Sequence, residues 1–315
     1  MKAWPGLDYS AAADTYRTLH LWTQIMGKLR LQLMPWFNHS WHLTLRLTPA
    51  GLHTDLMPVH DGHLDLLLDM HAQQLVLTHS DGRRVARSLL DLSVAAAYRW
   101  LFAALEAWGI FVRIDPRPNE LTDVPLLSED ETPRHYVPDH ARAWYRALLD
   151  SWNVLTRFRA GYRGKCSPVH FFWGSFDLAV TRFSGRPAPL HPGGIPALPD
   201  WVAQEAYSHE VSSVGFWPGD PAHPEAYYYA YCYPEPTGFP DADVQPAAAH
   251  YDTGLGEYLL PYEAVRRSGQ PAETLLAFCE TTYRAGADLA SWSRAELEGG
   301  LADFIARRQR NRQSD

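Results

Sequence analysis

The sequence predicts an α+β fold, built from an internally duplicated unit of helix, antiparallel sheet and helix whose two pseudo-twofold-related halves pack together. Three observations favour it: helical periodicity at the start of each half, period-two segments separated by turn signals, and local likeness between the halves. The segment 16–19 (YRTL) resembles 145–148 (YRAL), and 40–43 (SWHL) resembles 175–178 (SFDL). We expect one repeat over 1–138 and a second over 139–315. Coincidence between two amphipathic helices that precede strands is the alternative.

The first half begins with a helix over about 11–33, for which Ser10 is a favoured N-cap residue and which Pro35 ends. Period-two alternation predicts a strand over 38–47. A turn signal at 49–51 leads into a second strand that ends at 56. Two more strands are expected over 64–70 and 75–79, with turn signals at 60–63 and 80–82. Together these strands form an antiparallel meander. Ser93 is expected to cap a helix to Trp108, and a short strand over 110–114 closes the half.

The second half follows a proline-rich, acidic linker or covering loop over 115–138. A helix is expected over 139–162, and then one long apolar strand over 168–186, which we expect at the centre of the fold. A Pro/Gly-rich loop over 186–200 and a short helix over 201–207 come next. The remaining elements are strands over 209–216, 226–233 and 257–262, a helix from Pro271, and a helix opened by Ser293.

Composition excludes several classes of protein. The chain has 315 residues and a formal net charge of −8, which gives no general attraction to nucleic acid. Its three cysteines lie far apart, which argues against a disulfide framework or a thiolate zinc site and favours a reducing, cytoplasmic setting. We see no signal-peptide core and no apolar run that could span a membrane. Neither GxGxxG, nor a P-loop, nor GxSxG is present.

The candidate site centres on Asp177, because a carboxylate within an apolar strand needs a partner. If the two repeats correspond, Asp177 matches His42, and both would lie on polar strand faces that line one cleft. A carboxylate beside an imidazole orients it and raises its pKa, which makes the pair a usable acid and base. The alternative is two satisfied polar residues in a sheet.

Further candidates surround this pair. A second ionisable group is expected among His170, His209 and Glu210. The substrate would be bound by guanidinium forks, aromatic rings, hydroxyl groups and a histidine of a possible lid loop: Arg182, Arg186, Trp173, Trp217, Ser175, Tyr229 and His191. The arginines could equally be solvated in a turn, and the tyrosine row at 227–233 could be a half-buried sheet face. His39 and His42 point apart on a strand, so no metal site is assigned.

Four strings, at 170–186, 207–213, 215–219 and 38–42, resemble an uncharacterised bacterial family, known as domain of unknown function 5996. The resemblance spans nearly the whole chain. It implies a bacterial source and carries no activity, cofactor or catalytic residue with it.

From the residues, we expect an enzyme that acts by general acid/base catalysis, through hydrolysis or proton-transfer isomerisation, on a small polar, anionic or aromatic molecule. A non-catalytic small-molecule binding protein is the first alternative, and a metal-dependent enzyme with His, Asp and Glu ligands is the second. A scaffold protein would need an exposed apolar surface. The sequence identifies neither a cofactor nor an oligomeric state.

Overall fold

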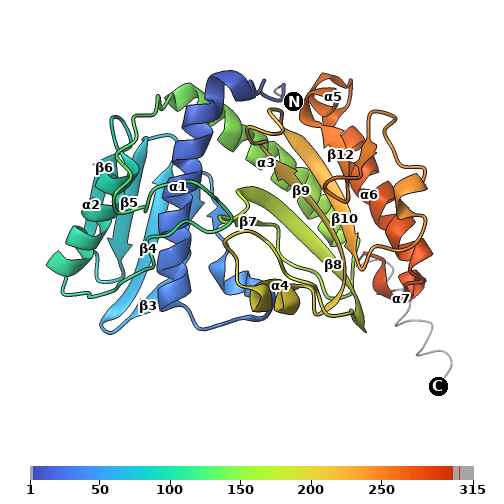
Figure 1. Ribbon diagram of the computed structural model, residues 1–315, viewed down its shortest axis with the longest axis horizontal. Coiled ribbons are helices and arrows are strands. Elements are labelled where there is room, and N and C mark those ends of the chain that lie inside the picture. The colour runs from blue at the N-terminus through green and yellow to red at the C-terminus, as the bar shows by residue number, and fades with distance from the viewer. Residues whose placement is uncertain (1–2, 301–304, 306–315) are drawn as a thin grey trace.

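The computed structural model describes residues 3–300 and 305, and it combines helices with two six-stranded antiparallel sheets that lie side by side (Figure 1). The predicted α+β class is thereby confirmed. No helix of this part of the chain has both the length and the apolar character needed to cross a bilayer.

The first sheet is an antiparallel meander with strand order β1-β2-β4-β5-β6, in which β3 also pairs with β4. Its strands are β1 (Arg46–Leu47), β2 (Gly51–His53), β3 (Met57–Val59), β4 (Gly62–Asp69), β5 (Gln74–His79) and β6 (Arg84–Ser88). Alternate residues of β4 are buried, so one face of this sheet forms the core of the first half.

Two helices pack against this sheet, α1 (Tyr9–Leu33) and α2 (Val94–Ala107). Helix α1 begins one residue before the expected cap, because the side chain of Asp8, not that of Ser10, accepts a hydrogen bond from the backbone of Ala11. Ser93 caps α2 as predicted, by accepting from the backbone N–H of Ala96.

The second sheet has strand order β11-β12-β10-β9-β8-β7. Its strands are β7 (His170–Phe172), β8 (Asp177–Pro187), β9 (His209–Trp217), β10 (Tyr227–Tyr233), β11 (His250–Asp252) and β12 (Glu257–Pro261). The two sheets are joined at their edges, where Leu45 and Phe171 exchange backbone hydrogen bonds in an antiparallel bridge.

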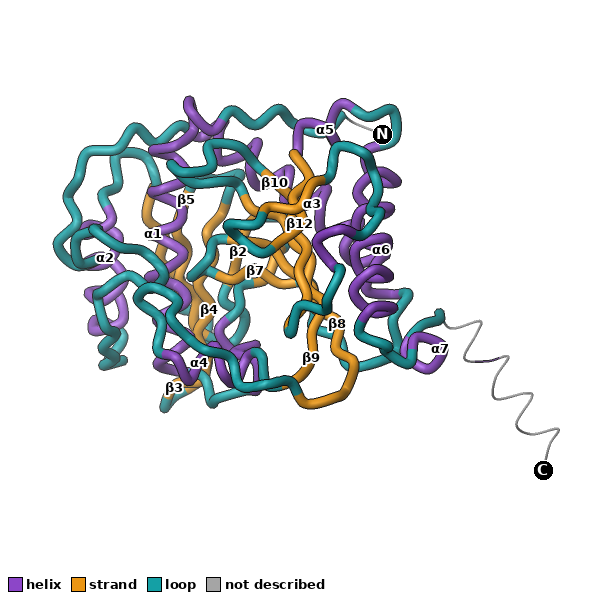
Figure 2. Tube along the Cα trace, turned by 45° about the vertical axis from the view of Figure 1, so that its right-hand side comes forward, coloured by secondary structure: helices purple, strands orange, loops and turns teal. Residues whose placement is uncertain are grey.

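Helices α3 and α6 cover one face of the second sheet and pack against each other. In Figure 2 they lie on one side of the strands, and loops lie on the other. The helical elements of this half are α3 (Pro138–Ala160), α4 (Asp200–Ala206), η2 (Phe239–Asp241), α5 (Tyr262–Arg267), α6 (Pro271–Leu289) and α7 (Arg294–Leu297). The starts of α3, α4 and α6 agree with the sequence analysis to within a residue.

Three predicted strands are wrong. The segment 38–47 is mostly a 3₁₀ helix, η1 (Asn38–Leu43), in which His39 and Ser40 have φ values of 57° and 54°. The predicted strand over 168–186 is a hairpin: β7 and β8 are joined by a tight turn in which Phe176 has φ 61°. Residues 110–114 form no strand. Strands β3, β6 and β11 and helix α5 were not expected.

The likeness between 40–43 and 175–178 therefore does not extend to local structure, because the first segment is helical and the second runs from a turn into a strand.

The second sheet presents a polar face away from α3 and α6. Strand register places Ala179, Gly215 and Tyr229 opposite one another on this face, and likewise Thr181, Ser213 and Tyr231. The alternating residues Leu178, Val180, Phe216 and Tyr228 are buried on the helix side. The predicted alternation along β8 and along the tyrosine row is thus confirmed.

Candidate functional site

Three carboxyl groups from distant segments gather at the polar face of the second sheet. Asp177 begins β8, Glu257 begins β12, and Glu120 comes from the loop between α2 and α3. Burial, and next the charge of Asp177, raise the pKa of both glutamates, so the three groups are close enough to affect one another's ionisation. We call these three residues, together with Tyr229, the carboxylate cluster.

Asp177 is buried but has partners. Its carboxylate accepts a hydrogen bond from Ser175 at 2.5 Å, and another from the hydroxyl group of Tyr229. Burial raises the pKa of Asp177, and these two hydrogen bonds oppose the rise because they stabilise the ionised form. Three residues of the predicted site, Asp177, Ser175 and Tyr229, are therefore brought together.

Tyr229 reaches Asp177 because the residue between them has no side chain. Gly215 lies opposite Tyr229 in the ladder, and a Cβ atom at Gly215 would collide with the tyrosine hydroxyl group and lie 2.5 Å from the carbonyl oxygen of Leu178. The phenol ring occupies that space instead.

Glu120 is positioned by helix α1. Gln24 binds the backbone of Asn119 on both sides: its amide nitrogen donates to the carbonyl oxygen at 2.7 Å, and its oxygen accepts from the N–H at 2.8 Å. Lys28, one turn further along, donates to the side chain of Asn119 at 2.5 Å. The next residue, Glu120, adopts φ 57°, and its carboxylate packs against Gly174, where a Cβ atom would collide with it.

Glu120 and Glu257 share an unusual environment. Neither carboxyl group makes a hydrogen bond or ion pair with the described residues, yet both side chains keep part of their surface accessible. Burial, followed by the charge of Asp177, raises the pKa of each to about 7. At neutral pH each group can therefore hold or release a proton.

Phenol rings extend the cluster along the sheet. Tyr207, just after α4, and Tyr231 of β10 are joined through their hydroxyl groups at 2.9 Å. The His191 ring stacks on the ring of Tyr207 with 4.7 Å between centroids. The loop over 186–200, for which the sequence analysis raised a lid role, therefore lies against this end of the sheet. Burial raises the pKa of Tyr207 to about 12, so this phenol stays protonated and can donate a hydrogen bond.

The predicted pair of Asp177 and His42 does not form. No hydrogen bond or ion pair joins these two described residues. His42 belongs to η1, where its Nδ1 accepts from the backbone of Phe37 at 3.2 Å and its carbonyl oxygen accepts from Arg30. The strand that would have directed His42 to the sheet face does not exist.

Both predicted substrate arginines have structural roles. Arg182 is 1% exposed, and its guanidinium carbon lies 3.4 Å from the ring centroid of Phe158 and 4.4 Å from that of Tyr283, on the helix side of the sheet. Arg186 pairs with Glu210 at 2.7 Å and donates to the carbonyl oxygen of Ala290, which ties β8 and β9 to the end of α6. Glu210 is therefore also engaged.

The other predicted residues lie outside the cluster. His170 is buried, has no partner for either ring nitrogen among the described residues, and has a pKa lowered to about 4 by burial. His209 accepts from or donates to Ser208. Trp173 is buried and donates to the carbonyl oxygen of Leu43, and Trp217 lies beside His223.

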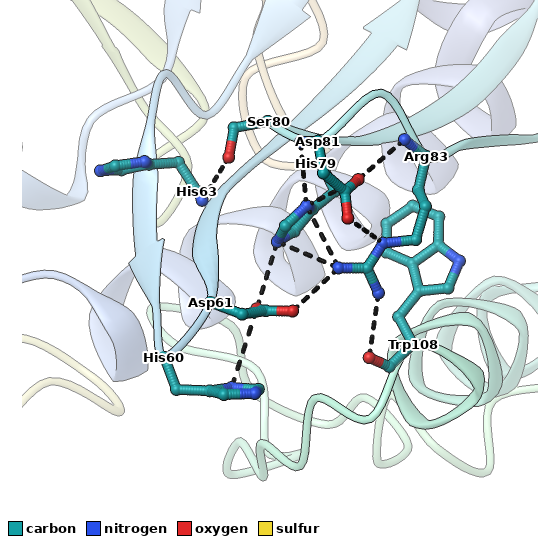
Figure 3. A network of polar contacts seen from close by, with 8 residues as sticks. All are labelled: His60, Asp61, His63, His79, Ser80, Asp81, Arg83 and Trp108. Carbon is teal, nitrogen blue, oxygen red and sulfur yellow. Dashed lines mark hydrogen bonds and ion pairs between the residues drawn. The ribbon is translucent and has the colours of Figure 1, made fainter.

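A separate charged network occupies the first sheet (Figure 3). Arg83 pairs with Asp61 at 2.9 Å and with Asp81 at 2.7 Å, and His79 lies between the same two carboxylates at 3.2 and 2.9 Å. Arg83 also donates to the carbonyl oxygen of Trp108. The network fastens the β3–β4 and β5–β6 turns to the end of α2, and every charged group in it has a partner.

Metal ligation finds no support in the geometry. Within residues 3–300 and 305, no three His, Cys, Asp or Glu side chains are grouped so that they could hold an ion.

Sequence reasoning missed Glu120, Glu257 and Tyr207. Glu120 lies in a proline-rich stretch whose position in space no periodicity reveals. Glu257 was placed at a strand start without a role, although a carboxylate there carries the same signal that singled out Asp177.

Comparison with known proteins gives a family without an activity. No curated protein matches the chain, and no solved structure matches it. One family model covers residues 4–299 and is described as a family of unknown function, DUF5996. Because that match spans nearly all of the chain, the protein belongs to the DUF5996 family.

Proposed function

We propose that the protein is an enzyme that uses the carboxylate cluster for general acid/base catalysis on a small polar molecule. One observation carries the proposal. Two accessible carboxyl groups without a protein partner, Glu120 and Glu257, adjoin the buried Asp177 and have pKa values of about 7. Carboxyl groups with strongly perturbed pKa values are frequent at catalytic sites.

The environments suggest separate roles. Glu120, protonated for part of the time at neutral pH, would donate a proton to the substrate. Asp177, held by Ser175 and Tyr229, would serve as the base or stabilise a developing positive charge. Hydrolysis or proton-transfer isomerisation fits this division, because each needs one proton donor and one acceptor.

The charge of the cluster favours a particular class of ligand. None of the basic side chains in the described part of the chain pairs with Glu120, Asp177 or Glu257, and the phenols of Tyr229 and Tyr231 line the same sheet face. Carboxylates without cations repel anions. We therefore propose a neutral polyhydroxylated or a cationic substrate, and no longer the anionic one that the sequence left open.

A ligand screen tests this proposal. Thermal shifts would be measured with matched sets of cationic, polyhydroxylated and anionic small molecules, and every hit would then be assayed for turnover. We expect hits in the first two sets, and loss of turnover in Glu120→Gln and Asp177→Asn. Stabilisation by anions alone, or full turnover in Glu120→Gln, would contradict the proposal.

A non-catalytic binding protein is the second candidate. It is favoured by the stacked His191 and Tyr207 rings, which offer a flat aromatic surface beside the carboxylates. In that case Asp177→Asn would weaken binding of the screened ligand, and no product would form with any hit.

We also propose that the two halves arose by duplication, with the boundary at 138/139. Each half runs from a long helix through six strands to a further helix. Leu45, which directly precedes β1, meets Phe171 of β7 in an antiparallel bridge, an arrangement that is compatible with a local twofold axis. A cytoplasmic location is a further prediction, supported by the composition alone.

A further inference from the structure

A lysine and a histidine meet at a second place in the molecule. Nζ of Lys165, in the segment between α3 and β7, lies 2.5 Å from Nε2 of His39 in η1. Nδ1 of His39 lies 3.0 Å from the carbonyl oxygen of Ala206. Because a carbonyl oxygen only accepts hydrogen bonds, Nδ1 carries the ring proton, and Nε2 directs its lone pair at the lysine.

His39 is held in place by its backbone. Its φ of 57° and that of Ser40, 54°, lie in the left-handed region, which is uncommon for residues other than glycine. The backbone N–H of His39 donates to both carboxylate oxygens of Glu205, at 3.0 and 2.8 Å. Unfavourable backbone conformations that neighbouring groups hold in place are frequent at functional sites.

The lysine head group has an apolar surrounding and is reachable. Lys165 is exposed, and its Nζ lies 4.9 Å from the ring centroid of Phe183 and 5.6 Å from that of Trp41. Partial burial lowers the pKa of Lys165, and the charge of Glu205 opposes this change. The neutral amine is therefore more populated than in a free lysine.

The charge of Lys165 affects the protonation of His39. Burial, and next the charge of Lys165, lower the pKa of His39 to about 4, so the ring is neutral while the ammonium is charged. Once Lys165 loses its proton, that repulsion disappears and the imidazole becomes a better base. This coupling suits a histidine that takes a proton from the amine during a reaction.

Lysine is rare in this chain. Three of the 28 basic residues are lysines, at positions 2, 28 and 165. Arginine, the usual basic residue here, does not lose its proton in proteins. Lys28 is 4% exposed and donates to Asn119, so it is not free to react. Lys165 therefore places an amine that can lose its proton at this position, where an arginine would remain a permanent cation.

We propose that Lys165 is a nucleophilic amine that forms an imine with an aldehyde, preferably an aromatic one, with His39 as its proton acceptor and donor. The amine attacks the carbonyl carbon, a C–N bond forms, and the C=O π electrons move to oxygen. His39 takes a proton from nitrogen and gives it to that oxygen, and the carbinolamine loses water to leave a C=N bond. Water is the only other product. This site is independent of the carboxylate cluster.

Reductive trapping tests the proposal. The full chain would be treated at pH 7.5 with benzaldehyde and sodium cyanoborohydride, and the labelled lysines would be identified by peptide mass spectrometry. We expect Lys165 to react faster than free Nα-acetyl-lysine, because its lowered pKa leaves more of the neutral amine at this pH. Glyoxylate should react more slowly than benzaldehyde, because Glu205 disfavours an anion and the rings favour an aromatic group.

Variants separate the two roles. Lys165→Arg keeps the positive charge and should give no adduct at this position. His39→Asn, which tolerates a positive φ, should leave the circular dichroism spectrum unchanged and lower the labelling rate about tenfold. Labelling of Lys165 at the rate of free lysine, or an unchanged rate in folded His39→Asn, would overturn the proposal. Lys28 serves as the internal control and should stay unlabelled in every sample.

Discussion

Tyr229 donates its phenolic hydrogen to the carboxylate of Asp177 across Gly215, a residue of the strand that separates β10 from β8. This contact connects three strands through one polar interaction on the sheet face opposite α3 and α6. It depends on the phenol, the carboxylate and the missing side chain, and each can be tested by one substitution.

Tyr229→Phe should destabilise the protein. The substitution removes a hydrogen bond to a buried carboxylate, and such bonds contribute about 1.5–3 kcal/mol. Chemical denaturation at pH 7.5 would measure the loss in the free energy of unfolding. Tyr233→Phe is the matched control, because its hydroxyl group donates to the carbonyl oxygen of Pro189 at an exposed position. Equal losses in the two variants would show that Asp177 gains nothing from Tyr229.

Gly215→Ala should disrupt the same contact from the other side. The added methyl group would collide with the Tyr229 hydroxyl group and the backbone of Leu178, and overpacking of this kind costs about 1–3 kcal/mol. Gly269→Ala is the control, since no atom lies within 4 Å of a Cβ at that position. A thermal unfolding midpoint for Gly215→Ala no lower than that of Gly269→Ala would contradict the described packing.

Stability should fall as the pH rises from about 5 to 8. The folded-state pKa values of Glu120 and Glu257 are raised to about 7, above the ordinary value of about 4.3. The folded state therefore binds more protons than the unfolded state in this window, and the contribution is lost as the pH passes through 7. Urea unfolding at closely spaced pH values would show the decline.

Glu120→Gln should flatten this pH dependence and stabilise the protein at pH 8 by about 1–3 kcal/mol. The reason is that a glutamine amide stays neutral, whereas the carboxyl group of Glu120 must ionise in a buried place at this pH. Glu106→Gln, at an exposed position of α2, should leave the slope unchanged. Parallel curves for the wild type and Glu120→Gln would mean that Glu120 does not titrate near neutral pH.

The sequence revealed the strand half of this site but not the loop half. Asp177 attracted attention because a carboxylate interrupts an apolar β-segment, and period two placed Tyr229 on a common face of its strand. These are local signals. Glu120 arrives at Asp177 only because Gln24, nearly a hundred residues away, binds the backbone beside it, and no spacing in one sequence encodes such a contact.

The failure at His42 has a different physical origin. The alternation over 38–47 fits a strand, but His39 and Ser40 adopt left-handed conformations that turn the chain into η1. Side-chain patterns do not report φ, and the backbone hydrogen bonds to Glu205 that hold this turn are tertiary. Arg182 was misassigned because it was expected to lie beyond the strand, whereas β8 continues to Pro187 and places Arg182 on the same buried face as Leu178 and Val180.

Gln24→Ala should release Glu120 without changing any residue of the carboxylate cluster. Gln24 fixes Asn119 through two hydrogen bonds, so its loss should cost about 1–3 kcal/mol and let the Glu120 carboxyl group move into solvent. The pKa of Glu120 should then fall toward the ordinary value, and the decline of stability between pH 5 and 8 should become shallower, as in Glu120→Gln.

Gln32→Ala, at an exposed position near the end of α1, is the control for Gln24→Ala. A Gln24→Ala variant that loses stability equally at all pH values would show that Gln24 supports the fold but does not position Glu120.

His170→Phe should raise resistance to acid. Burial lowers the pKa of His170 to about 4, below the ordinary value of about 6.5, so the folded state binds fewer protons than the unfolded state between these values. The stability associated with neutral His170 is therefore present above pH 6.5 and is lost as the pH falls toward 4. Phenylalanine removes that loss and also removes two ring nitrogens that have no partner among the described residues. In His170→Phe, the unfolding midpoint of an acid titration followed by tryptophan fluorescence should move to lower pH.

His250→Phe, at an exposed edge-strand position, is the control and should leave the midpoint in place. An unchanged midpoint in His170→Phe would mean that His170 already carries a proton in the folded protein.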